Sequence, residues 1–434
     1  MKNKTIGLFG AIGYDDMGDD ALLLSNLEAF EQKGYNIVIF SNNTSRTKNL
    51  LISNGFLTDS SISNKTRIVK NLNYYIKSHQ LYMVVDIIVN RLLKSSYDIV
   101  RTVNYYYVAN KICKELDRKD MSNSQYLEYI TNIKECSLIL FIGGGYMNKY
   151  WGYHIYQFIN ALSIADKLGI PCVASGQTFG PFDYLQKSIV KKNIFKLKSI
   201  QTRDINRSKK RLLELGYHDD KITEGPDDAI FFSRNEDYVN RYNAQFIVII
   251  NLGSFISYAK LPLETMYTIL AQFFDYLVEN RNAIILNISM TTREQDIDRG
   301  ESIQSKMKYK EKFRYIALFT DLKTIKAIIS SSNLVVSSRL HPIVFAISEK
   351  RPFIGISSDG EYYDSKLMGI SEIYNYRPEN HIIRADDLTL DKLKQCFILA
   401  MADKYDRDHI YELNKNKREQ FLKKIEDILM GKNV

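Results

Sequence analysis

The chain has 434 residues, enough for two or three domains, and its 45% hydrophobic and 25% charged residues are ordinary globular proportions that exclude a disordered chain. Lys and Arg number 59 against 50 Asp and Glu, which gives a net charge of +9. This excess favours an anionic partner, and because no long block of like charge interrupts the chain, small phosphorylated ligands are favoured over nucleic acid.

The cysteines and the apolar runs limit the cellular compartments in which the protein is expected. The four cysteines form no C-x-x-C pair and have no nearby histidine, so neither a disulfide framework nor a zinc site is predicted, and a reducing compartment is favoured. No signal-peptide stretch opens the sequence, and the longest apolar runs are far shorter than the ~20 residues that cross a bilayer. We therefore expect a soluble, cytoplasmic protein.

Short apolar runs alternate with helical patterns in two series. The first series predicts strands at Thr5–Phe9, Asn36–Phe40, Leu138–Ile142, Cys172–Ser175 and Ser199–Thr202. The second predicts strands at Phe246–Asn251, Ala283–Ser289, Arg314–Leu318, Leu334–Ser337 and Phe353–Ser357. Helical periodicity lies between them, for example at Asp20–Phe30, Leu263–Leu277 and Leu322–Ile329. Unalternated apolar strands separated by helices indicate parallel sheets, and hence an α/β protein with two doubly wound Rossmann-like domains.

The same pattern predicts the domain boundaries. We expect an N-terminal domain at 1–235, a C-terminal domain at 236–385, and a helical segment at 386–434 that packs back on the first domain. Between about 58 and 132 the alternation stops, and the sequence is basic, rich in Tyr and helical in pattern. We interpret this stretch as a helical insertion in the first domain.

The first strand leads into a turn rich in Gly and Asp, from Gly10 to Asp20. Its glycines, including Gly13, do not have the G-x-G-x-x-G spacing, so a dinucleotide site is not supported. Carboxylates such as Asp16 and Asp19 suit sugar hydroxyls, or a base that activates one. The alternative is that Asp19 or Asp20 only caps the following helix.

Two more glycine-containing loops follow predicted strands. Gly143, Gly144 and Gly145 come directly after Leu138–Ile142, and Gly176–Pro181, which contains Gln177, follows Cys172–Ser175. The carboxyl ends of parallel strands meet at one edge of a sheet, so three such loops predict a ligand site there. For each loop by itself, a plain tight turn is the alternative.

Cationic residues also follow predicted strands. Arg203 ends the strand at Ser199–Thr202, and Arg339 and His341 follow Leu334–Ser337 where a helix begins. Arginine can hold an oxyanion through two hydrogen bonds, and histidine can transfer a proton near neutral pH. Lys366 is a further candidate cation. A surface ion pair is the alternative for Arg203, and a structural role is the alternative for His341.

Taken together, these loops resemble the polysaccharide pyruvyl transferase family. The matching segments keep the order of the family's motifs: Asp16-Met17-Gly18-Asp19-Asp20-Ala21, the triple glycine, Gly176–Pro181, Arg203-Asp204 with Ser208, Asp227-Asp228-Ala229, Ser337–His341 and Tyr363-Asp364-Ser365-Lys366. The chain departs from the family at Asp16, Asp20, Asn148 and Lys149, where the family usually has other residues. These departures lie on the presumed acceptor side, so the acceptor sugar cannot be carried over from a relative.

The resemblance implies a glycosyltransferase-B-like fold and transfer of pyruvate from phosphoenolpyruvate onto a sugar of a cell-surface polysaccharide or its precursor, as a cyclic ketal. It further implies His341 as the acid and Asp19 as a base. Phosphoenolpyruvate and acceptor would be bound by Arg203, Arg339, Lys366, Gly13, Asp16, Gly144, Gly145 and Gln177. No metal or cofactor is expected. The expected partners are phosphoenolpyruvate and a lipid- or nucleotide-linked acceptor, with no nucleic acid; peripheral contact with the inner membrane face stays open.

Two other functions stay open. A nucleotide-sugar glycosyltransferase could share this architecture, although no two Glu residues lie eight positions apart, a spacing often seen in enzymes that retain configuration. A non-catalytic sugar-binding subunit of a polysaccharide assembly system is the other alternative, and intact Arg203, Arg339 and His341 argue against it.

Overall fold

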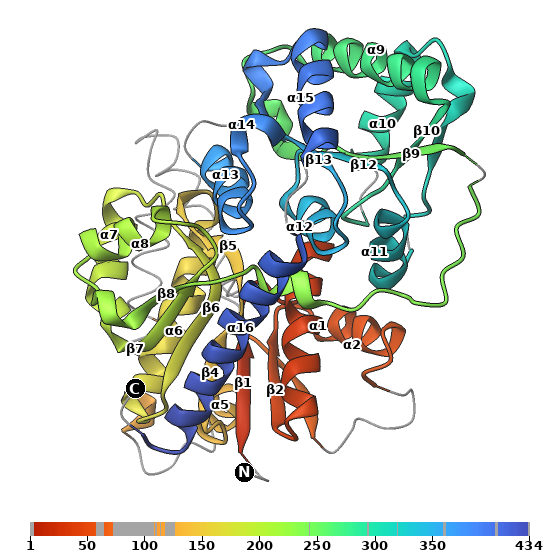
Figure 1. Ribbon diagram of the computed structural model, residues 1–434. Coiled ribbons are helices and arrows are strands. Elements are labelled where there is room, and N and C mark those ends of the chain that lie inside the picture. The colour runs from red at the N-terminus through yellow and green to blue at the C-terminus, as the bar shows by residue number, and fades with distance from the viewer. Residues whose placement is uncertain are drawn as a thin grey trace, which may run out of the picture.

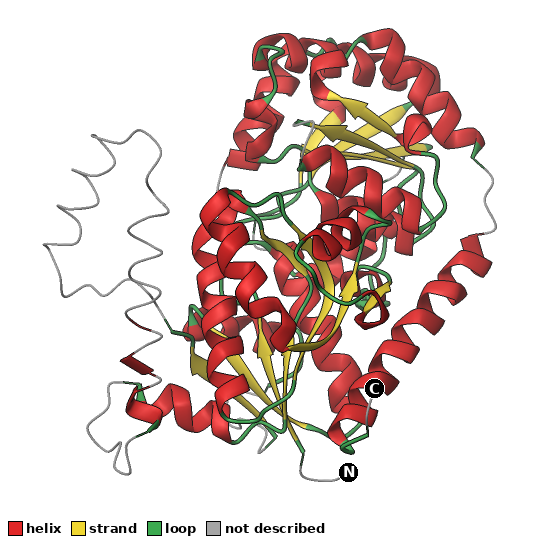
Figure 2. Cartoon of the chain, turned by 90° about the vertical axis from the view of Figure 1, so that its left-hand side faces the viewer, coloured by secondary structure: helices red, strands yellow, loops and turns green. Residues whose placement is uncertain are grey.

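The computed structural model describes residues 4–57, 65–72, 126–242, 244–292, 295–318, 320–358, 362–403 and 407–432, with a few residues between 108 and 117. Two parallel sheets, each covered by helices on both faces, form two domains that lie one above the other (Figures 1 and 2). This arrangement confirms the predicted α/β class. The predicted insertion at about 58–132 lies mostly outside the described residues.

The first sheet has the strand order β3-β2-β1-β4-β6-β7-β8, and β5 pairs with β6. Its strands are β1 (Thr5–Phe9), β2 (Asn36–Ser41), β3 (Thr66–Lys70), β4 (Leu138–Phe141), β5 (Gly144–Met147), β6 (Cys172–Phe179), β7 (Leu197–Thr202) and β8 (Ile222–Glu224). The helices around it are α1 (Met17–Gln32), α2 (Thr44–Ser53), α5 (Leu127–Lys134), α6 (Gly152–Lys167), α7 (Tyr184–Asn193) and α8 (Arg207–Glu214), with short 3₁₀ turns η1 (Lys149–Trp151), η2 (Ile194–Lys196), η3 (Asp219–Lys221) and η4 (Asp228–Phe231).

The second sheet has the order β11-β10-β9-β12-β13-β14. Its strands are β9 (Phe246–Asn251), β10 (Ala283–Asn287), β11 (Phe313–Tyr315), β12 (Leu334–Ser337), β13 (Phe353–Ser357) and β14 (Ile382–Arg384). The main helices are α9 (Leu263–Arg281), α10 (Gln295–Lys306), α11 (Leu322–Ser330), α12 (Leu340–Ser348), α13 (Tyr363–Ile373), α14 (Pro378–His381), α15 (Leu390–Ala402) and α16 (Arg407–Leu429). In both sheets the strand order reverses beside the first strand of the domain, and such switch points are where ligands bind in open α/β sheets.

The burial of consecutive residues along the strands explains why helices cover both faces of each sheet. Consecutive positions of the adjacent strands β1 and β4 are buried, from Ile6 to Phe9 and from Leu138 to Phe141. Consecutive positions of β9, from Phe246 to Asn251, are buried as well. Because neighbouring residues of a strand point to opposite faces, both faces of each sheet must be covered, which the helices of Figure 2 do.

The ten predicted strands are present, but some bounds differ. The largest difference is in β6, which runs on to Phe179 instead of ending at Ser175, so Gly176 and Gln177 belong to a strand and not to a loop. Helix α1 begins at Met17, three residues before the predicted start. In the described part of the chain, four strands were not predicted, β3, β5, β8 and β14, and each has only three to five residues.

The last helix, α16, runs back across the first domain, so that both ends of the chain lie there (Figure 1). Arg418 of α16 is buried and donates to Oδ1 of Asp228 at 2.7 Å and to Oδ1 of Asn26 at 2.6 Å. On the surface, Lys33 and Glu426 form a second link between α1 and α16. Within the described parts of the chain, no helix combines the length and hydropathy that a membrane span needs.

The carboxyl edges of the two sheets face each other across the domain boundary. Backbone N–H of Met17, at the start of α1, donates to the carbonyl of Met290 after β10 at 2.9 Å. The N–H of Thr292 donates to Oδ1 of Asp15 at 2.8 Å. Two loops from different domains are thereby fixed at the same place, and the candidate site lies between them.

Candidate active site

A cavity of about 230 Å³ lies between the two domains. The first domain lines it with residues of the α1 turn, of the segment from β5 to α6, and with Arg203 after β7. The second domain lines it with residues after β10, at the start of α12, and at the start of α13. Its lining includes seven of the residues predicted from the sequence: Asp16, Asp19, Gly145, Arg203, Arg339, His341 and Lys366.

The acidic turn before α1 has a structural role as well as a place in the cavity. Asp16 is the N-cap, and its Oδ1 accepts from the N–H of Gly18 at 2.8 Å and of Asp19 at 3.3 Å. The expectation that Asp19 or Asp20 caps the helix is therefore wrong, because the helix begins earlier. Asp20 instead pairs with both terminal nitrogens of Arg46, at 2.8 and 2.6 Å. Asp19 is left to face the cavity.

Arg203 is almost fully buried at the end of β7, so a surface ion pair is excluded for it. Its Nη1 donates to Oδ2 of Asp227 at 2.5 Å, and its Nε donates to Oγ1 of Thr178 at 3.0 Å. Among the described residues, its Nη2 has no hydrogen-bond partner. A buried donor without a partner is costly, so this nitrogen indicates a place for a ligand oxygen.

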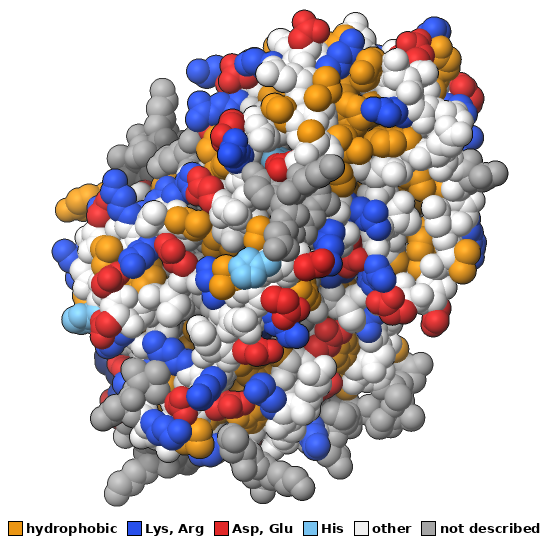
Figure 3. Space-filling view, viewed as in Figure 1, with side chains coloured by type: hydrophobic (Ala, Val, Ile, Leu, Met, Phe, Trp, Pro, Cys, Tyr) orange, Lys and Arg blue, Asp and Glu red, His pale blue; other side chains and the backbone are white. Residues whose placement is uncertain are grey.

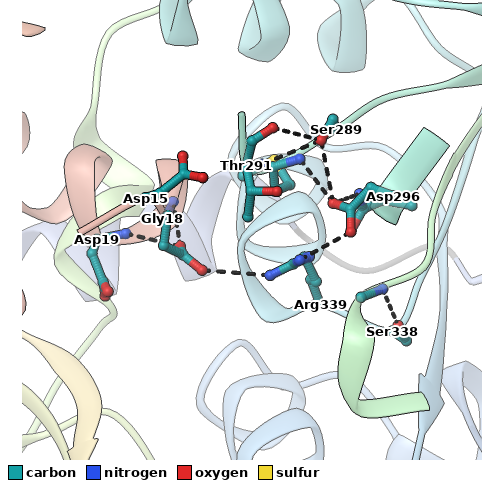
Figure 4. Close-up of polar contacts among 12 residues, drawn as sticks. Asp15, Gly18, Asp19, Ser289, Thr291, Asp296, Ser338 and Arg339 are labelled. Atoms are coloured by element: carbon teal, nitrogen blue, oxygen red, sulfur yellow. Dashed lines mark hydrogen bonds and ion pairs between the residues drawn. The ribbon is translucent and has the colours of Figure 1, made fainter. Parts of the chain in front are cut away.

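Arg339 is the N-cap residue of α12 and lies between acidic groups of the two domains (Figure 4). Its Nη2 donates to Oδ1 of Asp296 at 3.0 Å, and its Nη1 lies 3.5 Å from Oδ2 of Asp16. Burial alone would lower the pKa of Arg339, but the two carboxylates outweigh it and raise the pKa, so the guanidinium stays charged. Its Nε has no hydrogen-bond partner in the described part of the chain.

His341 is buried against the first turn of α1. A Cβ at Gly18 would overlap the imidazole ring, so the close approach requires glycine at this position. Nε2 of His341 lies 4.0 Å from Oδ2 of Asp227 and has no hydrogen-bond partner within the described ranges. Burial lowers the pKa of His341 to about 3, against the opposing effect of Asp16, so the ring is neutral in the free protein.

Asp19 and Lys366 face the same cavity from opposite domains. Burial, with repulsion from Asp16, raises the pKa of Asp19 well above its usual value, although Lys366 opposes the shift. Burial and the nearby charge of Arg203 lower the pKa of Lys366 to about 8. Both groups can therefore change protonation state more readily than an exposed Asp or Lys.

Aromatic residues form one wall of the cavity. The hydroxyl of Tyr362 donates to the carbonyl of Gly145 at 2.6 Å and so joins the domains. The ring of His154 lies against those of Tyr14, Tyr146 and Trp151, with centroids 4.7, 5.9 and 6.3 Å away. Burial lowers the pKa of His154 to about 3, so this wall is uncharged. An uncharged aromatic surface beside carboxylates suits a sugar ring and its hydroxyls.

Three predicted substrate-binding residues lie behind the cavity and do not line it. Gln177 is buried within β6, and its Nε2 donates to the carbonyl of Ile142 at 2.5 Å and to the hydroxyl of Tyr146 at 2.8 Å. Gly144 has φ +152°, and a Cβ there would crowd the ring of Tyr146. Gly13 has φ +85° and lies against Ser41 and Asn43 of the next loop. These residues shape the turns that carry Tyr146 and the α1 turn.

The sequence interpretation missed the carboxylates that hold the two arginines. The motif match at Asp227-Asp228-Ala229 predicts no partner for Asp227, yet this residue pairs with Arg203 and faces His341. Asp296 in α10 pairs with Arg339 and also accepts from the N–H of Met290 at 3.1 Å. The family motif around Asp227 was a signal for the first of them. For Asp296, 43 residues from its partner, the sequence holds no comparable signal.

Fold and site together define a two-domain α/β protein with a cavity at its domain boundary that is lined by Arg203, Arg339 and Lys366. The family model of polysaccharide pyruvyl transferase matches residues 17–360, and the chain belongs to this family. No curated protein matches the sequence.

Solved structures match almost the whole chain at low identity. A putative UDP-N-acetylglucosamine 2-epimerase from Listeria monocytogenes is 11% identical, covers 98% of each chain and has a TM-score of 0.56. The UDP-GlcNAc 2-epimerase from Neisseria meningitidis, solved with UDP-GlcNAc, is 11% identical over 97% of this chain and 100% of its own, with a TM-score of 0.56. A glycosyltransferase from Rickettsia africae is 13% identical over 99% of each chain, with a TM-score of 0.53. At these identities the similarity establishes the glycosyltransferase-B type of fold alone.

Proposed function

We propose that the protein transfers the enolpyruvyl group of phosphoenolpyruvate onto two hydroxyls of a sugar, forming a pyruvate ketal and inorganic phosphate. The observation that carries this proposal is the set of buried nitrogens without partners in the described residues: Arg203 Nη2, Arg339 Nε and His341 Nε2. All three residues line one cavity, and Lys366 adds a third cationic side chain to the two arginines. A small ligand with both a carboxylate and a phosphate matches several fixed cationic groups converging on one place.

His341 is proposed to protonate the enol carbon. Its ring is neutral in the free protein because burial lowers its pKa to about 3. A bound anion beside the ring favours the imidazolium, so phosphoenolpyruvate brings the conditions under which His341 takes up a proton. Transfer of that proton to the CH₂ carbon leaves a cationic centre on the adjacent carbon, next to the phosphate oxygen.

Asp19 is proposed to accept the proton of the attacking hydroxyl. The raised pKa of its carboxylate makes it a stronger base than an exposed aspartate. The hydroxyl oxygen bonds to the cationic carbon, and the C–O bond to phosphate then breaks. A second hydroxyl closes the ring and gives its proton to the departing phosphate. The electron pair of the broken bond leaves on phosphate, where Arg203, Arg339 and Lys366 stabilise the charge.

The sugar is proposed to bind against the aromatic wall on the side of the acidic turn. Asp16 and Asp19 lie on that side, and Trp151 and Tyr14 supply ring surfaces. Carboxylates repel an anionic sugar, so a neutral acceptor is favoured at this position.

Titration calorimetry with phosphoenolpyruvate and, separately, with UDP-N-acetylglucosamine tests the proposal. We expect binding of phosphoenolpyruvate that is lost in Arg339→Ala. Mass spectrometry of surface glycans from cells with and without the gene would then show the pyruvyl ketal only in the former. A protein that binds the nucleotide-sugar and ignores phosphoenolpyruvate would be a glycosyltransferase, and the proposal would be wrong.

A further inference from the structure

One segment of the first domain carries an excess of positive charge. Residues 181–218 contain ten Lys or Arg and three Asp or Glu. The segment includes α7, η2 and α8, which lie together at the left of Figure 1. In Figure 3 blue and orange side chains stand next to each other over this part of the molecule.

One helical stripe of this segment carries both lysines and aromatic rings. Tyr184, Lys187, Lys191 and Phe195 are spaced three or four residues apart along α7 and η2, so they share one side of the helix. All four are exposed, Tyr184 to 87% and Phe195 to 44%. Phe195 rests on the rings of Tyr217 and His218, which hold it at the surface.

The stripe continues to the mouth of the cavity. The N–H of Lys149 donates to the carbonyl of Pro181 at 2.8 Å, which joins η1 to the loop before α7. Lys149 and Tyr150 are exposed, while Trp151, the next residue, lines the cavity. We call this surface the lysine–aromatic face; it consists of Lys149, Tyr150, Tyr184, Lys187, Lys191, Lys192 and Phe195.

We propose that the lysine–aromatic face docks on an anionic phospholipid bilayer and so brings the cavity to a lipid-linked acceptor. Tyrosine and other amphipathic rings favour the headgroup region, and lysines bind the negative surface of anionic lipids. Between Phe182 and Arg203 the one acidic residue is Asp183, and its Oδ1 accepts from the N–H of Gln186 at 2.8 Å as the N-cap of α7. The three lysines of α7, Lys187, Lys191 and Lys192, are exposed and present their charge to the surroundings. The docking itself does not depend on the proposed function. Only the statement that docking brings a lipid-linked acceptor to the cavity rests on that function.

Flotation of the full chain with vesicles tests the docking without any substrate. We expect binding to phosphatidylcholine vesicles that contain 30% phosphatidylglycerol, weak binding to pure phosphatidylcholine, and a loss of binding as salt rises. Each lysine near an anionic surface contributes about fivefold in affinity, so Lys187→Gln, Lys191→Gln and Lys192→Gln together should weaken binding about 100-fold. Tyr184→Ser should weaken it further without disturbing the fold, since this side chain is exposed.

A matched triple variant in α16 serves as control. Lys415→Gln, Lys417→Gln and Lys423→Gln remove the same charge from another Lys-rich helix, and we expect vesicle binding within about twofold of wild type, because these lysines lie outside the face. Loss of binding in the α16 variant but not in the α7 variant would overturn the proposal, as would a wild-type protein that ignores anionic vesicles. A wild-type dimer in solution that the α7 variant abolishes would assign the face to a second copy instead. Since no phosphoenolpyruvate is present, none of these outcomes depends on the proposed chemistry.

Discussion

Arg339 allows the binding role of one cavity residue to be separated from its structural role. Its partner Asp296 is held by several other groups, including the N–H of Met290 at 3.1 Å and Nδ2 of Asn251 at 3.2 Å. Removal of the guanidinium therefore leaves Asp296 hydrogen-bonded. Arg299 also lies near Asp296, at 3.7 Å, but does not line the cavity. The two arginines form a matched pair for mutation.

We expect Arg339→Ala to lower kcat/KM for phosphoenolpyruvate by about 100-fold or more, since a charged group that stabilises the transition state contributes roughly 3 kcal/mol. Arg299→Ala should stay within about threefold of wild type. Steady-state kinetics and thermal unfolding of both variants provide the measurement. Equal losses of activity in the two variants would mean that Arg339 acts by supporting Asp296.

Lys366 predicts how the reaction depends on pH. Burial and Arg203 lower its pKa to about 8, so the ammonium is charged below that pH and neutral above it. Binding of an anionic substrate should be at full strength below pH 8 and should weaken as the pH rises through it. Because kcat/KM reports ionisations of the free enzyme, its profile should fall above about pH 8.

Lys366→Arg tests the assignment, because arginine stays charged throughout this range. We expect a lower kcat/KM, since the longer side chain fits the cavity less well, but no decline between pH 7 and pH 9.5. A decline in the variant at the same pH as in wild type would assign that ionisation to another group.

At the scale of elements, α16 fixes the position of the segment that holds Arg203. Asp227 faces the cavity, whereas its neighbour Asp228 faces the opposite way and accepts from Arg418, Asn26 and Ser175. The carbonyl of Asp228 also accepts from Ser25 at 2.6 Å. The last helix of the chain is thereby connected, through two adjacent aspartates, to a cation of the cavity.

We expect Arg418→Met to lower the free energy of unfolding by about 3–5 kcal/mol, since it leaves the buried carboxylate of Asp228 without its ionic partner. Lys33→Met is the matched control, because the Lys33–Glu426 pair links the same two helices at the surface and should contribute less than about 1 kcal/mol. Urea unfolding measures both. Similar losses in the two variants would show that Arg418 contributes packing and not charge.

The predictability of the elements follows their length and burial. The long apolar strands, such as β1 and β9, were predicted with their bounds because uninterrupted runs like Phe246–Asn251 are distinctive. Short edge strands such as β8 and β14 contain two adjacent apolar residues or fewer, too few for a pattern. The predicted strand at Cys172–Ser175 is too short because Gly176 and Gln177 are typical of a turn. In the structure they continue β6, since β5 pairs with this part of the strand.

The residues of the site also divide into those that could be predicted from the sequence and those that could not. Residues that follow a strand, such as Arg203 and Arg339, could be placed at the sheet edge from sequence, because strand direction fixes where they emerge. Their partners Asp227 and Asp296 could not be assigned from sequence, because only the tertiary fold brings each carboxylate to its arginine. Nor could the sequence distinguish Gln177, which supports Tyr146 from behind, from a residue that lines the cavity.

At the scale of the whole molecule, the cavity exists only where the domains meet. Asp16, Asp19 and Arg203 come from one domain, and Arg339, His341 and Lys366 from the other. Arg207 and Glu372 add an ion pair across the boundary, with Nη2 and Oε1 2.8 Å apart. A substrate bound between the domains is therefore enclosed by both, which strengthens each electrostatic contact.

The proposed reaction uses cationic side chains from both domains in the role that a metal ion has in many phosphate-transferring sites. We therefore expect phosphate release in EDTA to stay within about twofold of the untreated rate, since the cost of removing a required metal would be far larger. A parallel assay with added Mg²⁺ is the control. Loss of activity in EDTA that Mg²⁺ restores would contradict the mechanism.

The contact between Gly18 and His341 has a consequence for natural variation. Any side chain at position 18 would occupy the space of the imidazole, so a substitution there cannot be accepted unless position 341 changes too or the domains move apart. Glycine normally weakens a helix, and alanine here would otherwise be favourable. Selection for His341 in the second domain should therefore keep glycine at position 18 in the first domain. Across the family, the two positions should be inherited as a pair.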